Sequence, residues 1–138
     1  MKRLVDSLRS HITGQVGCGA YFIEVDDEQP AYPYVLLWTT VGSLESNTLD
    51  GSRDLWDRLG VTMVHTTSNN VLVLAQKVRA ALTGFTPQSD TWRIEELRPP
   101  FDSQPIDRDR DVSIPGVGYP SFAVDLYRLA GTAKVSTR

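Results

Sequence analysis

The sequence predicts an α+β fold, in which a mostly antiparallel sheet of four to five strands is covered on one face by two helices. Two segments repeat apolar residues at helical spacing, and several shorter segments alternate apolar with polar side chains. Stretches rich in glycine and proline separate them. The 138 residues, of which 41% are hydrophobic and 22% charged, match the size and composition of one globular domain. We therefore expect residues 1–138 to form a single domain.

The clearest helix is predicted at residues 68–84, SNNVLVLAQKVRAALTG. Its apolar side chains recur every three or four residues and would line one face. Ser68 or Asn69 can cap its start, and Gly84 can end it in a left-handed conformation. A second apolar stripe predicts a shorter helix at residues 2–13, formed by Leu4, Val5, Leu8 and Ile12.

Alternation and β-branched or aromatic content predict five strands. They are expected at residues 20–25, 33–41, 59–67, 91–97 and 121–129. The segment 33–41, PYVLLWTTV, is almost continuously apolar, which is typical of a central strand covered on at least part of both faces. The segment 91–97 is expected at an edge. In the last segment Phe122, Val124 and Leu126 alternate with Asp125 and Tyr127.

Two long connections remain, at residues 42–58 and 98–120, and connections of that length are often functional. Large aromatic side chains on such segments must be buried somewhere, either on their own domain or in an interface. Aromatic residues and arginines anchor protein interfaces, so we expect both loops to contact other subunits. The candidate contact residues are Asp54, Trp56 and Arg58 in the first loop and Phe101, Arg108, Arg110 and Tyr119 in the second. The alternating charges of residues 107–111 are equally consistent with a solvated loop.

The sequence predicts no catalytic, cofactor-binding or metal-binding residues. The two histidines, His11 and His65, lie far apart and outside any zinc-binding spacing. Cys18 is the only cysteine, and a Cys-His pair would require a tertiary contact that the sequence does not show. The glycine-rich segment around it lacks the ending of a phosphate-binding loop. The alternative is a small enzyme or ligand-binding domain that uses Cys18, His65 and the acidic turn at 26–28.

Charge and hydropathy exclude other classes. Fourteen lysines and arginines against seventeen acidic residues give a net charge of -3, which argues against nonspecific nucleic-acid binding. A single cysteine cannot form an intrachain disulfide, which favours a reducing compartment. No apolar run approaches the roughly 20 residues that span a bilayer, and the N-terminus lacks the apolar core of a signal peptide. We expect neither secretion nor membrane insertion.

Three segments carry a resemblance to a known family: PYVLLWTTV, LGVTMVHTTSNNVLVLAQKVRAALTG and SFAVDLYRL, in this order after a first helix. The arrangement resembles the tail terminator (tail completion) proteins of long-tailed bacteriophages. In that family an apolar strand, a polar cap and a helix with an Ala-Leu-x-Gly-like stop match residues 61–67, 68–70 and 80–84 here. The two long loops have no counterpart that can be carried over.

The resemblance implies a structural virion protein without enzymatic activity or cofactor. It implies a homo-oligomeric ring, commonly a hexamer, that ends the tail tube and provides the surface for joining the head. The implied partners are other copies of the chain, the tail-tube protein and a head-tail connector, with DNA passing through the lumen without sequence-specific binding. The protein would be assembled in the host cytoplasm and reside in the tail or neck of the virion. Another neck protein, such as a stopper, is the alternative within this class.

Overall fold

The computed structural model describes residues 2–23, 25, 31–39, 54–114 and 118–134. Within these residues the chain forms two helices and six strands, which confirms the α+β class. Their order is α1 (Lys2–Val16), β1 (Gly19–Phe22), β2 (Tyr34–Thr39), β3 (Asp54–His65), α2 (Ser68–Leu82), β4 (Trp92–Ile94), β5 (Asp102–Arg108) and β6 (Ser121–Ala133).

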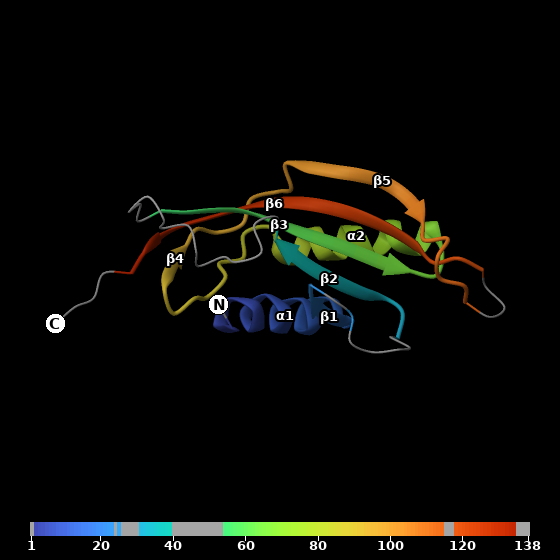
Figure 1. Cartoon of the computed structure of the whole chain (residues 1–138), viewed down its shortest axis with the longest axis horizontal. Coiled ribbons are helices and arrows are strands. Elements are labelled where there is room, and N and C mark those ends of the chain that lie inside the picture. The colour runs from blue at the N-terminus through green and yellow to red at the C-terminus, as the bar shows by residue number, and fades with distance from the viewer. Residues whose placement is uncertain (1, 24, 26–30, 40–53, 115–117, 135–138) are drawn as a thin grey trace.

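The strands form one sheet in the order β1-β2-β3-β6, with β4 and β5 both paired to the far side of β6. Figure 1 shows β5 at one edge of the sheet and β1, beside α1, at the opposite edge. The pair β1 and β2 is parallel, and every other pair is antiparallel. The sheet is therefore mixed, with one strand more than the sequence predicted.

Both helices pack on one face of the sheet and enclose a single hydrophobic core. The apolar stripe of α1 and the stripe of α2 are buried against alternate residues of the central strands, because neighbouring residues of a strand point to opposite faces. The fully buried side chains of this core include Leu4, Leu8, Ile12, Val35, Leu37, Leu59, Val61, Met63, Val71 and Val78. The remaining residues of the same strands point to the opposite, helix-free face, which we call the open face.

The ends of the helices differ from the prediction. Thr67 caps α2, because its extended backbone lets the side-chain oxygen accept a hydrogen bond from the Asn70 amide at 3.2 Å. Ser68, one of the two predicted caps, is instead the first helical residue. At the other end Gly84 has the expected left-handed conformation, with φ of +86°. The first helix continues past its predicted end to Val16, and Gly17, with φ of +80°, follows it.

Two predicted loops contain strand. Residues 54–58 pair with β6 as the first part of β3, so the loop predicted at 42–58 is wrong there; residues 42–53 lie outside the described residues. Three of those five residues are charged, and this composition hid the strand. Residues 102–108 form β5 inside the loop predicted at 98–120. Pro105 lies where the pairing with β6 shifts register, which is where a strand tolerates proline.

Candidate interaction surface

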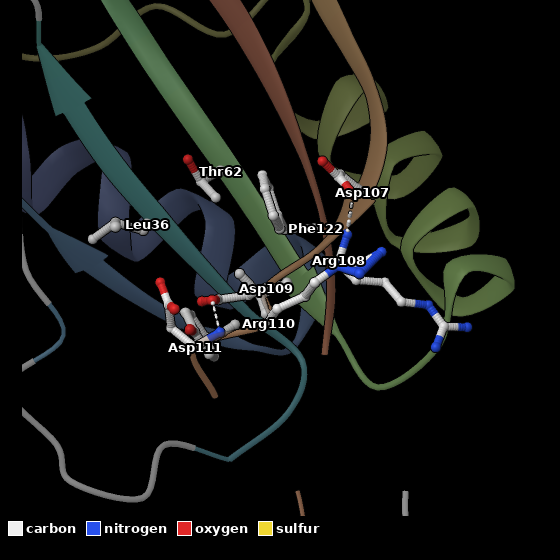
Figure 2. Close-up of a pocket in the computed structure, with 10 residues that line it drawn as sticks. Leu36, Thr62, Asp107, Arg108, Asp109, Arg110, Asp111 and Phe122 are labelled. Carbon is white, nitrogen blue, oxygen red and sulfur yellow. Dashed lines mark hydrogen bonds between the residues drawn. The ribbon is translucent and has the colours of Figure 1, made fainter. Parts of the chain in front are cut away.

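The open face of the sheet holds a groove of about 600 Å³ (Figure 2). Its floor consists of side chains that point away from the helices on three adjacent strands. They are Tyr34 and Leu36 of β2, Thr62 and Val64 of β3, and Phe122 of β6. Residues 107–111, at the end of β5 and just beyond it, form the wall. The groove thus combines an apolar and aromatic floor with a charged rim.

The strand register shows on which face of the sheet each charged residue of the groove wall lies. Asp107 pairs with Phe122 and Arg108 pairs with Ser121, and paired residues lie on the same face. Phe122 lines the open face, whereas Ser121 is buried toward the helices. Asp107 therefore faces the groove, and the side chain of Arg108 extends on the helix side.

Asp109 continues this alternation. Its amide donates a 2.9 Å hydrogen bond to the carbonyl of Pro120, which extends the pairing by one residue. Burial raises the pKa of the Tyr34 hydroxyl at the groove floor, and the charges of Tyr32, Asp109 and Tyr21 raise it further. Asp109 thus belongs to the open face, and Figure 2 shows it beside Asp111, whose amide donates to its carboxylate.

A tryptophan is fixed beside the groove by a close approach of two strands. A Cβ atom on Gly60 would lie 2.1 Å from the ring of Trp38, so only glycine leaves room for this ring. The Trp38 indole donates a 3.0 Å hydrogen bond to the Thr62 hydroxyl. The floor next to Thr62 is therefore held in one arrangement by packing and by a hydrogen bond.

The predicted contact residues of the first segment lie further along β3. Trp56 is 55% exposed on the open face, and the guanidinium carbon of Arg128 lies 4.7 Å from its ring centroid, a cation-π distance. Arg58 is exposed opposite Arg128. Asp54 is the first residue of the strand. Thr62 is six positions beyond Trp56, so this cluster lies about 20 Å along the strand from the groove.

The predicted contact residues of the second segment are divided between two places. Arg108 and Arg110 line the groove, although register turns the side chain of Arg108 toward the helix side. Phe101, 54% exposed, precedes β5 and donates its amide to the carbonyl of Leu126. Tyr119 is 42% exposed, next to Gly118. The role of all seven residues in contacts stays a prediction.

The groove floor was not among the predicted sites. Its residues were recognised only as parts of strands, since an alternating pattern does not show which face a helix covers. The signal available was the nearly continuous apolarity of residues 33–41, which predicted that both faces of that strand are at least partly covered. The second face of β2 is indeed partly buried, and it contributes to the groove floor.

A buried polar network joins three elements on the helix side. The Asp125 side chain is fully buried and accepts two hydrogen bonds from Arg79, at 2.7 and 2.9 Å, and one from Ser103 at 2.7 Å. These residues belong to β6, α2 and β5. The hydrogen bond to Asp125 raises the pKa of Arg79. Burial likewise raises the pKa of Tyr127, two residues along β6. The Asp125 carboxylate thus accepts hydrogen bonds from both Arg79 and Ser103, which is typical of a structural ion pair.

The described residues that the alternative enzyme prediction relies on take part in the packing and hydrogen bonding of the fold. Cys18 is buried, and burial raises the pKa of its thiol, the opposite of what a nucleophilic thiolate needs. His65 accepts a 2.8 Å hydrogen bond from the Thr66 amide at Nδ1. His11 donates to the carbonyl of Ala81 and stacks on Phe85. The acidic turn at 26–28 lies outside the described residues.

In the described part of the chain, no group of three or more histidine, cysteine, aspartate or glutamate side chains is placed to hold a metal ion. No helix in that part is long and apolar enough to cross a membrane.

The fold is shared with known structures. A chain from the virion of a native gene transfer agent (GTA) particle superposes with a TM-score of 0.59 and 15% sequence identity, over 96% of this chain and 96% of that chain. A second solved chain matches with a TM-score of 0.53 and 15% identity, over 99% of this chain and 92% of the other. No protein-family model and no curated protein matches the sequence. At this identity the likeness concerns the fold.

Proposed function

We propose that this chain is a structural subunit of a phage-like virion, and that it forms a ring that ends the tail tube and receives the head. The observation that carries the proposal is the fold match to a chain of a gene transfer agent virion, which extends over nearly the whole of both chains. The order of sequence segments that resembles tail terminator proteins supports the same assignment.

The chemistry of the surface supports assembly over catalysis. Trp56 and Phe101 are more than half exposed, and large exposed aromatics commonly anchor protein interfaces. The apolar floor of the groove adds a second region of this kind. The partners in this proposal are other copies of the chain, commonly six in a ring, the tail-tube protein and a head-tail connector, with DNA passing through the lumen. The protein acts in the neck of the virion after assembly in the host cytoplasm.

Electron microscopy of the purified protein, alone and mixed with assembled tail tubes, tests this function. We expect rings that cap one end of the tubes. Rings that bind the portal side and ignore the tubes would instead identify another neck protein, such as a stopper. A protein that remains single in both samples contradicts the whole class.

The enzyme alternative is tested by the reactivity of Cys18 toward a thiol reagent between pH 6 and pH 9. Because burial raises the pKa of this thiol, we expect slow modification of the native protein that speeds up only on unfolding. Fast modification of the native protein at pH 6 would favour thiol chemistry.

A further inference from the structure

Two surfaces on opposite faces of the subunit have complementary properties. The groove lies on the open face of the sheet. On the helical side, α2 buries Val71, Leu74 and Val78 and leaves Leu72 and Val73 about half exposed, at 49% and 50%. Leu72 and Val73 are consecutive in the helix, so their side chains project in different directions from its exposed side, where a partner could cover them.

Both surfaces lie at the same end of the molecule. The Ser68 hydroxyl, in the first turn of α2, is 3.2 Å from the hydroxyl of Ser121. Ser121 is the neighbour in sequence of Phe122, which lines the groove. The start of α2 and the groove are therefore back to back across the sheet.

The charges of the two surfaces are opposite. Asp107 and Asp109 face the groove, and Asp111 lines it beside Arg110. The helix α2 has no acidic residue, and Lys77 lies one turn beyond Val73 on its exposed side. Arg108 adds a second cation to the helix side. One side of the subunit thus offers an apolar floor with a rim on which three aspartates outnumber Arg110, and the other offers apolar side chains beside cations.

We propose that the groove of one copy receives the outer surface of α2 of the next copy, around Leu72, Val73 and Lys77. This inference rests on the proposed ring and specifies its contact. The contact is heterologous, because two different patches meet, and such contacts close into rings when the rotation between copies allows it. A twofold contact of groove with groove would bring acidic rims together, which is unfavourable.

Cysteine cross-linking tests the contact directly. Val73→Cys and Asp111→Cys place one exposed thiol on each surface, and the native Cys18 is buried. We expect a disulfide-linked dimer on mild oxidation when the two variants are mixed, and none from either variant alone. A cross-link formed by Val73→Cys alone would mean that like surfaces meet, and would overturn the proposal.

Charge reversal provides a second readout. Lys77→Glu and Asp109→Lys should each weaken ring formation by about tenfold or more, because like charges would face each other, and the double variant should recover most of the loss. Lys2→Glu, also exposed on a helix, is the control and should leave assembly unchanged. Circular dichroism checks that each variant is folded.

The outcomes distinguish a failure of the proposed contact from a failure of the proposed ring. Rings that form normally with both charge variants, and without cross-links in the mixture, overturn this contact and leave the proposed function standing. Binding of the groove to the tail-tube protein without contact between copies also overturns it. If no ring forms in any condition, both proposals fail.

Discussion

At the scale of single residues, Asp125 is the charged side chain on which the interior depends most. It is fully buried, whereas its partner Arg79 is 38% exposed. Losing one partner of this ion pair therefore has a different consequence from losing the other. Without Arg79 the carboxylate keeps only the Ser103 hydroxyl, while without Asp125 the guanidinium can turn toward water.

We predict that Arg79→Ala lowers the free energy of unfolding by about 3 kcal/mol, because a buried charge loses its partner. Replacing both residues, as Arg79→Met with Asp125→Leu, should recover most of that loss. Lys2→Met, at an exposed position of α1, is the control and should change stability by less than about 0.5 kcal/mol. Urea denaturation measures all three. An Arg79→Ala variant as stable as the control would contradict this account.

His65 makes stability depend on pH. Burial lowers its pKa below the ordinary value of 6.5, and its Nδ1 accepts a hydrogen bond from the Thr66 amide that protonation would remove. The unfolded chain therefore binds a proton at a higher pH than the folded one. His65 therefore contributes to the free energy of unfolding above pH 6.5. This contribution is lost as the pH falls toward the pKa that His65 has in the folded protein.

We accordingly expect the melting temperature to fall between pH 7 and pH 5.5, and His65→Asn to reduce that fall. Thermal unfolding followed by circular dichroism at several pH values measures it. A variant with the same pH profile as the original protein would show that other groups are responsible.

At the scale of elements, the start of α2 offers a direct comparison of the predicted and observed caps. Thr67→Ala removes the side-chain acceptor for the Asn70 amide and should cost about 1 kcal/mol. Asn69→Ala, at the other predicted cap, should cost less than half of that, because Asn69 is exposed inside the helix. Chemical denaturation of the two variants decides between the positions. Equal losses would contradict the observed cap.

The elements that the sequence predicted best are those whose local pattern and tertiary environment agree. Both helices were located because one stripe of each is apolar and faces the core. The central parts of β2, β3 and β6 were located because their residues alternate.

The elements that the sequence did not predict are stabilised by pairing with β6. The first residues of β3 pair with a strand far away in the chain, whereas β5 pairs with the strand that follows it. The charged residues of both segments, and Pro105 in β5, favour loops when considered locally. Alternation in β6 was predicted, but not that Asp125 and Tyr127, rather than Phe122 and Leu126, would face the helices. Asp125 is accommodated on that face by two hydrogen bonds from Arg79 of α2, and the local pattern of β6 does not show such a partner. The groove was missed for the same reason.

At the scale of the whole molecule, the anchors predicted from sequence can be tested in assembly. Trp56→Ala and Phe101→Ala remove large side chains that are more than half exposed, so the monomer should remain folded while ring formation weakens by about tenfold or more. Ile23→Ala, which removes an exposed apolar side chain outside both loops and the groove, is the control. Sedimentation velocity measures the assembled fraction, and circular dichroism the fold. Unchanged rings would remove both residues from the interface.

The outer side of β5 limits the ways in which copies can join. All seven residues of this strand are exposed, and in the described part of the chain no strand other than β6 pairs with it. An unpaired edge normally invites other chains to add on without end. Here Pro105 contributes no amide hydrogen, the ladder shifts beside it, and charged residues stand at both ends of the strand. Main-chain stacking into fibrils is thereby discouraged, and any contact between copies at this edge is left to side chains.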